Sequence, residues 1–226
     1  MTPKDLVDEA VALYAPLQVY SELVRFAGFL EGRRFNNILE IGSHRCGTLH
    51  VLGHHADRRI ISIDQNKFET RKYQEHFLTR APNALLIAGD SHQPETMDKL
   101  VAALAGETID LLFIDGDHSR AGVMEDFEDY SPLVRSGGFI VFHDVDPNHG
   151  HTREPYDAYK DITALNHAVH FEIIDTVPTP GFPYDNPQSL WRIIDILLHD
   201  PVFFVRHIDL KGLPPGFGGI GVMTKP

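Results

Sequence analysis

Two apolar runs in this sequence each end in a group of acidic and histidine residues. The run Leu111 to Ile114 is followed by Asp115, Asp117 and His118, and the run Phe139 to Phe142 is followed by His143 and Asp144. Carboxylate oxygens bind hard divalent cations, while imidazole titrates near neutral pH and also binds softer cations. Residues of these types in this pattern suit a metal site, a proton transfer, or both.

A glycine-containing turn precedes these groups. In the stretch LEIGSHRCGTL, Gly42 follows an apolar run and Gly47 stands where the next helical stretch begins. Glycine lets the backbone approach a ligand closely, and a helix N-terminus offers unpaired N–H groups. The spacing is not the G-x-G-x-x-G of nicotinamide and flavin proteins, and no G-K-[ST] indicates a P-loop. The same glycines also fit a tight turn that holds no ligand.

Five short apolar runs separated by helical patterns indicate a sheet that positions these residues. The runs are NNILEIG, RIISID, NALLIAGD, IDLLFIDGD and GGFIVFHD. They are continuously apolar rather than alternating, which is typical of parallel strands covered on both faces. Their polar ends are Glu40, Asp64, Asp90, Asp115 and Asp144. Ligands of open parallel sheets bind outside the carboxyl ends of the strands, so we expect these five side chains to line one crevice.

The fold predicted from this pattern is α/β, with a Rossmann-like, doubly wound, mainly parallel seven-stranded sheet. We expect a single domain over residues 1–226. Its parts are N-terminal helices at 1–35, interrupted at Pro16, a cofactor-binding core at 36–145, lid and acceptor loops at 146–188, and a C-terminal helix with an antiparallel edge hairpin at 189–226. The Pro, Gly, Asp and His content of 146–188 favours loops over a second core.

Composition excludes several functional classes. The chain has 226 residues, 42% of them hydrophobic, and a net charge of −12. An acidic surface repels phosphate backbones and anionic lipid, so neither nucleic acid nor a membrane is expected as a partner. The single cysteine, Cys46, rules out an internal disulfide, and no stretch resembles a signal peptide or a membrane span. A cytoplasmic location is therefore expected.

The turn and the later strand ends resemble a known family. The pattern E-x-G-x-x-x-x-G-[ST] at Glu40–Thr48 is similar to the first motif of class I S-adenosylmethionine-dependent methyltransferases. LLFIDGDHSRAGVMEDFEDYSPLVRSGGFIVFHDV resembles the branch with macrolide-sugar and rhamnosyl O-methyltransferases and cephalosporin-hydroxylase-like proteins. The resemblance covers residues 36–145 well and GFGGIGVM more loosely. It implies that S-adenosylmethionine is bound by Glu40, Gly42, Ser43, Gly47, Thr48, Asp64, Gln65, Asp90, Ser91 and Asp115.

Two of these cofactor positions have a structural alternative. Asp64 stands where a carboxylate can accept hydrogen bonds from both ribose hydroxyls. Asp90 and Ser91 stand where the family contacts adenine, but both are also favoured N-cap residues.

The resemblance also implies a divalent metal, usually magnesium, bound by Asp115, Asp144 and the residue at 143. His143 stands where the family has Asp or Glu. Because imidazole suits softer cations than Mg²⁺, three alternatives stay open. The metal is softer than magnesium, or His143 points elsewhere and water completes the shell around Asp144, or no metal binds.

His118 is the proton acceptor that the D-G-x-H motif implies, and its ordinary pKa suits the role. Asp117 is the rival base, or it orients His118. Alternatively, the stretch from Asp117 to Ser119 only caps a helix that begins near Ala121. Aromatic residues of the lid segment and the following helix are candidate stacking surfaces for a sugar or aromatic acceptor, or anchors for long loops. They are Tyr156, Tyr159, Phe182, Tyr184 and Trp191.

Together these residues predict a metal-assisted O-methyltransferase that acts on a hydroxyl of a small molecule such as a sugar or natural-product glycoside, and that self-associates. One alternative is a metal-dependent nucleotide-sugar glycosyltransferase that uses Asp115-Gly116-Asp117 as a D-x-D motif. Another is a protein that binds S-adenosylmethionine without catalysis. Binding of S-adenosylmethionine or of a UDP-sugar separates the first two.

Overall fold

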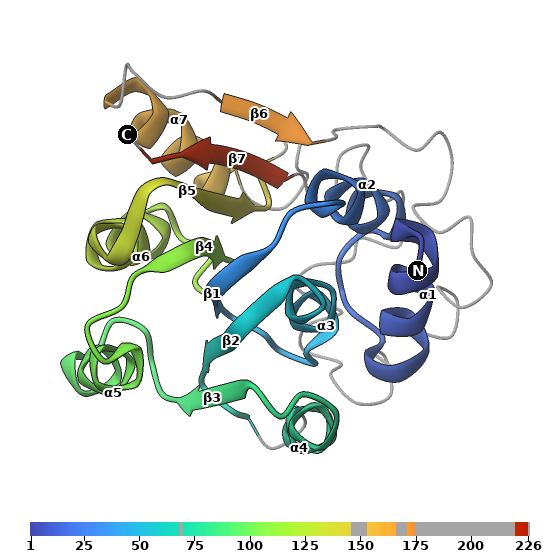
Figure 1. Cartoon of the computed structure of the whole chain (residues 1–226). Coiled ribbons are helices and arrows are strands. Elements are labelled where there is room, and N and C mark those ends of the chain that lie inside the picture. The colour runs from blue at the N-terminus through green and yellow to red at the C-terminus, as the bar shows by residue number, and fades with distance from the viewer. Residues whose placement is uncertain (68–69, 146–152, 166–170, 175–219, 226) are drawn as a thin grey trace.

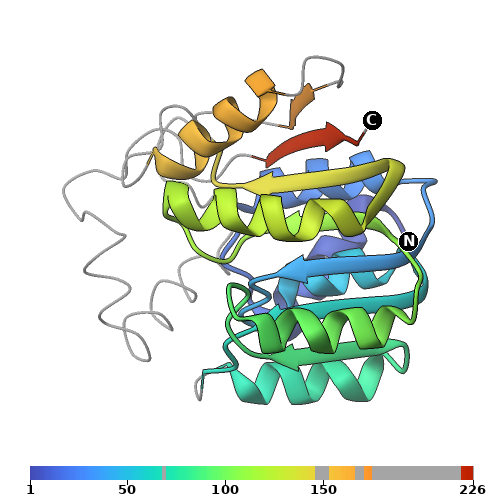
Figure 2. The ribbon, with the colours of Figure 1, turned by 90° about the vertical axis from the view of Figure 1, so that its left-hand side faces the viewer.

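One seven-stranded sheet in the order β3-β2-β1-β4-β5-β7-β6 organises the computed structural model (Figure 1). Its strands are β1 (Phe35–Ile41), β2 (Ala56–Asp64), β3 (Ala84–Ala88), β4 (Ile109–Ile114), β5 (Val134–His143), β6 (Phe171–Ile174) and β7 (Ile220–Thr224). The structure describes residues 1–67, 70–145, 153–165, 171–174 and 220–225. Strands β1 to β5 are parallel, and β7 is antiparallel to β5 and β6. In Figure 2 the arrow of β7 points opposite to that of β5. The predicted α/β, mainly parallel, Rossmann-like fold with an antiparallel edge pair is confirmed.

Helices cover both faces of this sheet (Figure 1). One face carries α1 (Pro3–Tyr14), α2 (Tyr20–Leu30), α3 (Gly47–Gly53) and α4 (Arg71–Arg80), and the other carries α5 (Pro94–Leu104), α6 (Arg120–Tyr130) and α7 (Glu154–Leu165). A short 3₁₀ turn, η1 (Ser131–Leu133), joins α6 to β5. Within the described ranges, none of the helices is both long and apolar enough to cross a membrane.

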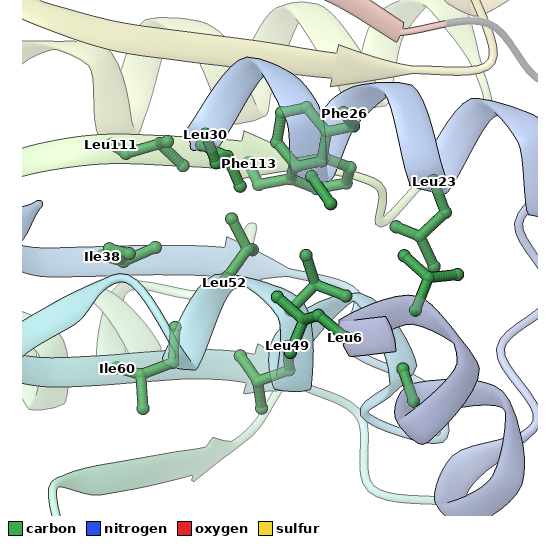
Figure 3. Close-up of a cluster of buried hydrophobic side chains, with 14 of the residues drawn as sticks. Leu6, Leu23, Phe26, Leu30, Ile38, Leu49, Leu52, Ile60, Leu111 and Phe113 are labelled. Carbon is green, nitrogen blue, oxygen red and sulfur yellow. The ribbon is translucent and has the colours of Figure 1, made fainter. Parts of the chain in front are cut away.

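The N-terminal helices belong to the core of the first face. In Figure 3, Phe26 and Leu30 of α2 lie against Leu111 and Phe113 of β4, and all four side chains are fully buried. Burying an apolar side chain of this size contributes about 1.5–3 kcal/mol each. Helix α1 begins at a capping box, in which the Thr2 hydroxyl accepts the Asp5 N–H and the Asp5 carboxylate accepts the Thr2 N–H. The buried side chains fix α2 on the sheet, whereas the capping box defines where α1 begins and α1 packs against α2 and α3.

The region predicted as lid and acceptor loops, 146–188, is partly regular and corrects that prediction. It contains α7 and β6. Helix α7 packs through Ala158, Tyr159 and Ile162, whose helical spacing is hidden in the sequence by polar and proline-rich flanks. The Tyr159 ring lies 5.4 Å from that of Phe142, so it anchors α7 to β5, while Tyr156 is half-buried.

The first strand of the antiparallel edge pair is not the one that the sequence predicted. We expected a hairpin within 189–226, and β7 is its second strand. The partner of β7 at the edge is β6, which precedes 189 in the chain. The predicted C-terminal helix, the first strand of the predicted hairpin, and Phe182, Tyr184 and Trp191 lie outside the described residues.

The turn after β1 requires glycine. Gly42 has φ +88°, and a Cβ there would lie 2.0 Å from the carbonyl oxygen of Asp115. The closeness arises because the N–H of Gly42 donates to the Ile63 carbonyl of β2 while the N–H of Asp115 donates to the Ile41 carbonyl. The first turn thus lies directly on the end of β4.

We predict that Gly42→Ala destabilises the protein more than Gly106→Ala. Gly106 has φ +84° with nothing within 4 Å of the position that a Cβ would take, so alanine there costs only the left-handed backbone, about 1–2 kcal/mol. Alanine at Gly42 adds a backbone clash, which the end of β4 must move to relieve. Chemical denaturation measures both. Equal losses would contradict the close approach of the two strand ends.

Candidate active site at the carboxyl edge of the sheet

Parallel register brings the predicted strand ends to one edge. Ile41 pairs with Ile63 and with Ile114, and Ile114 pairs with Phe142. The residues that follow these positions therefore emerge side by side. The convergence of Asp64 and Asp115 at one edge, on which the sequence interpretation depends, is confirmed.

Asp64 joins the first turn to the end of β2. Its carboxylate accepts the backbone N–H groups of His44 at 2.8 Å and Asn66 at 2.7 Å, and the side-chain amide of Gln74 at 3.1 Å. A carboxylate has about four acceptor sites, so capacity remains for a further donor. Gln65, the next residue, is exposed. Sequence reasoning did not find Gln74, which lies on α4 ten residues away.

A small, partly open hollow of about 30 Å³ lies between the carboxyl ends of β2 and β3. Its lining residues are Ser62, Asp64, Asn66, Gln74, Leu86, Ile87 and Ala88. Among the described residues, the buried Ser62 hydroxyl and the side-chain amide oxygen of Asn66 have no hydrogen-bond partner. Buried polar groups are normally paired, so this hollow has unmet capacity for a polar ligand between two apolar walls.

The remaining residues of the glycine turn are buried against the N-terminal segment. A Cβ on Gly47 would lie 2.2 Å from the Cβ of Pro16, so glycine here admits the segment between α1 and α2. Ser43 and Thr48 are both buried. At Gly47 the group that approaches the backbone closely is therefore Pro16 of this chain, rather than a ligand.

Glu40 is a buried carboxyl beneath this turn. It is 0% exposed, and neither oxygen has a hydrogen-bond partner within the part of the chain that the structure describes. Burial, followed by the charges of Asp115 and Asp64, raises the pKa of Glu40 well above its usual value. Its surroundings therefore favour the neutral form.

The predicted acid and histidine residues form one cluster at the ends of β4 and β5. His118 Nε2 lies 3.3 Å from Asp115 Oδ1, and His118 Nδ1 lies 3.5 Å from Asp144 Oδ2. His143 Nδ1 lies 3.2 Å from Asp115 Oδ1 and 3.3 Å from Asp144 Oδ1. Ligand atoms of Asp115, His118 and Asp144 all lie within 4.8 Å of one another, a spacing that suits a cation.

Backbone conformation explains how neighbouring residues reach the same cluster. Successive side chains of a strand point to opposite faces, which would separate His143 from Asp144. Asp144 has φ +59°, in the left-handed region that aspartate tolerates better than most residues. This turn at the end of β5 directs both side chains toward Asp115.

The charges in the cluster offset one another. Burial lowers the pKa of His118, but its hydrogen bond to Asp115 and the charge of Asp144 outweigh burial and raise the pKa to about 9. Burial also lowers the pKa of His143. The charges of Asp115, Asp144 and Glu22 outweigh burial and raise this pKa well above its usual value. Without a cation these carboxylates favour the protonated form of both rings. A cation between the carboxylates would remove the attraction that holds these protons.

Two residues of the cluster come from the N-terminal segment and were missed by sequence reasoning. The Gln18 amide donates to Asp115 Oδ2 at 2.8 Å, and Glu22 Oε1 lies 2.7 Å from His143 Nε2. The sequence did contain an indication that Glu22 is buried. Glu22 lies four residues before Phe26 and eight before Leu30, which places it on the core-facing side of α2. A carboxylate is rarely buried there without a partner.

Three predicted site residues have local structural roles. Asp117 Oδ1 accepts the Ser119 N–H at 2.8 Å, and the Ser119 hydroxyl accepts the Gly122 N–H at 3.0 Å, so this stretch does cap α6. Asp90 Oδ1 accepts the His92 N–H at 3.1 Å. The Ser91 carbonyl accepts the Tyr130 hydroxyl at 2.7 Å, which holds the turn after β3 against α6.

Comparison with known proteins identifies the domain that carries this edge. Residues 39–145 match a family model described as a methyltransferase domain. Over this stretch, slightly less than half of the chain, the protein is similar to a methyltransferase domain. Both the first turn and the cluster at β4 and β5 lie within it, whereas Gln18 and Glu22 precede it.

Solved structures share the fold of this methyltransferase domain and its flanking elements. One is an O-methyltransferase from Bacillus cereus in complex with SAH, with TM-score 0.54, 16% identity, and coverage of 99% of this chain and 90% of that one. Another is the O-methyltransferase TomG from Streptomyces achromogenes, involved in tomaymycin synthesis, in complex with SAM, with TM-score 0.55, 15% identity and coverage of 100% and 91%. The N-methyltransferase NodS from Bradyrhizobium japonicum has TM-score 0.52, 13% identity and coverage of 99% and 96%. Identities this low establish the fold alone.

A curated relative matches only a short stretch. The uncharacterized protein R132 of Acanthamoeba polyphaga mimivirus is 56% identical over 36 residues, which are 16% of this chain and 16% of that protein.

We predict that Glu40→Gln makes stability less dependent on pH. The raised pKa means that folded Glu40 keeps a proton that the unfolded chain releases above the ordinary glutamate pKa of 4.5. The wild type therefore loses stability relative to the variant as pH rises above that value. Thermal unfolding at pH 5 and pH 8 measures this, and the advantage of the variant should be larger at pH 8. An advantage that is constant or shrinks would show that Glu40 ionises readily.

Proposed function

We propose that the protein is an S-adenosylmethionine-dependent O-methyltransferase that uses a divalent cation and acts on a hydroxyl of a small molecule such as a sugar or natural-product glycoside. One observation carries this proposal. The hollow with unpaired polar atoms at β2 and β3 and the carboxylate and histidine cluster at β4 and β5 open on the same edge of a methyltransferase domain.

The hollow suits contacts with the ribose hydroxyls of the cofactor, whose remainder would lie outside it. Ser62, Asn66 and the remaining acceptor capacity of Asp64 offer hydrogen bonds to ribose hydroxyls, while Leu86 and Ile87 supply apolar walls. The acidic edge also favours the positive sulfonium. S-adenosylmethionine therefore fits this edge better than a UDP-sugar, whose diphosphate would be repelled unless fully neutralised by metal.

The cluster suits activation of the acceptor. A divalent cation bound between Asp115 and Asp144 would bind the acceptor oxygen and lower its pKa. His118 is 40% exposed and borders both carboxylates, so it can receive the hydroxyl proton. In the reaction the acceptor O–H bond breaks, the oxygen forms a bond to the methyl carbon, and the C–S bond breaks to give S-adenosylhomocysteine. The protein holds nucleophile, methyl group and sulfur in line.

Asp64→Asn should weaken binding of S-adenosylmethionine at least about tenfold, equivalent to about 1.4 kcal/mol, because it removes the charged acceptor that holds the first turn. Calorimetry measures the affinity. Asp57→Asn is the control, since Asp57 is an exposed residue near the opposite end of the same strand. Tight binding of a UDP-sugar with no binding of S-adenosylmethionine would contradict the proposal.

His118→Ala should keep cofactor binding and lower methyl transfer by roughly 10²–10⁴-fold, the usual contribution of a general base. Transfer is followed by mass spectrometry on a panel of sugars, phenols and glycosides, with the metal removed by chelation and then restored. If the variant kept full activity, the role of His118 would be wrong. If the wild type bound the cofactor but methylated nothing in the panel, a binding protein without catalysis would be the better account.

A further inference from the structure

Two histidines border the same two carboxylates, but their surroundings differ. We propose that His143, oriented by Glu22, is the imidazole ligand of a cation between Asp115 and Asp144, and that the site takes a transition ion such as Zn²⁺ or Co²⁺ in preference to Mg²⁺. The inference rests on the proposed function for the presence of a cation and adds its class and its ligands.

His143 has the geometry of an oriented ligand. Its side chain is 8% exposed, and Nε2 lies 2.7 Å from Glu22 Oε1. Nδ1 is buried and has no hydrogen bond of good geometry among the described residues, although carboxylate oxygens of Asp115 and Asp144 lie 3.2 and 3.3 Å away. A buried imidazole nitrogen is therefore aimed between two carboxylates.

Glu22 supplies what a metal-binding histidine usually has. Metal-bound histidines donate their second ring N–H to a carboxylate, carbonyl or water, which fixes the tautomer and the ring orientation. The Glu22 side chain is 3% exposed and rises from α2, so its position is set by the core. With the proton held on Nε2 by Glu22, the lone pair of Nδ1 is free for a cation.

His118 has the geometry of a proton carrier. It is 40% exposed, against 8% for His143. Both of its ring nitrogens face the cluster, and no carboxylate outside the cluster orients it within the described part of the chain. Its ligand atoms also fit a cation at this position, so it is the rival ligand. Exposure toward the acceptor and the lack of an orienting partner favour proton transfer.

The donor set then selects the ion. Mg²⁺ prefers oxygen ligands in a near-octahedral shell, whereas imidazole nitrogen favours Zn²⁺, Co²⁺ and their neighbours. One buried imidazole with two carboxylates, and open positions for the acceptor, suits these ions. The competing account has no cation at all, with two protonated rings offsetting the carboxylates.

Titration with Co²⁺, whose visible absorption reports its ligands, tests the proposal on the metal-free full chain. The chain has 14 histidines, and exposed ones can bind such ions weakly, so the relevant quantity is the tight equivalent that Asp115→Asn abolishes. We expect one such equivalent, displaced by Zn²⁺ at low and by Mg²⁺ only at far higher concentration. Absence of a tight equivalent, or its persistence in Asp115→Asn, would overturn the proposal.

Variants then assign the ligand. Glu22→Gln should weaken Co²⁺ binding by about 10–100-fold, and His143→Ala by more, while His118→Ala leaves it within a few-fold. His143→Asp should lower the preference for Co²⁺ over Mg²⁺ at least about tenfold, and His76→Asp at an exposed position controls for the change in charge. Thermal unfolding checks each variant, and Glu22→Gln carries the test if His143→Ala does not fold.

Opposite outcomes are equally decisive. If His118→Ala loses the tight equivalent and His143→Ala keeps it, the assignment is reversed and the proposal fails. Methyl transfer with Mg²⁺ alone and no effect of Glu22→Gln would sink this inference while leaving the proposed function intact. A tight, His143-dependent Co²⁺ site in a protein that does not bind S-adenosylmethionine would do the reverse.

Discussion

The accumulation of buried negative charge at one edge of the sheet is the constraint on which this structure depends. Parallel register places Glu40, Asp115 and Asp144 at neighbouring strand ends, and α2 adds Glu22, all of them nearly excluded from water. A buried carboxylate is costly unless it is neutralised, paired or bound to a cation. Glu40 meets this requirement by keeping its proton, and the others meet it through His118 and His143.

That constraint explains why the N-terminal helices are part of the site. Pro16 occupies the space that Gly47 leaves open, and Gln18 and Glu22 contact Asp115 and His143. The apolar face of α2 supplies the energy that holds these polar contacts in place, because Phe26 and Leu30 are buried on β4 (Figure 3). Helix α2 therefore supplies both the apolar packing on β4 and the carboxylate beside His143.

Sequence patterns were sufficient for the sheet and for the edge where its strands end. Continuous apolar runs bounded by polar residues predicted β1 to β5, and parallel pairing then placed Asp64 and Asp115 together without further information. Contacts between distant segments were not predictable in this way. Nothing local to Glu22 specifies that His143, 121 residues later, is its partner. Helix α7 and strand β6 were missed because proline-rich and polar flanks obscure short apolar patterns.

Glu22 precedes residue 39, so the stretch that matches the family model is shorter than the stretch that forms the cluster. Residues 39–145 are what family resemblance recognises, yet two side chains that hold the cluster come from outside that stretch. Trimming the chain to residues 39–145 would remove Gln18 and Glu22, the side chains that contact Asp115 and His143. A change in α2 can therefore alter the surroundings of His143 even where every residue of 39–145 is unchanged.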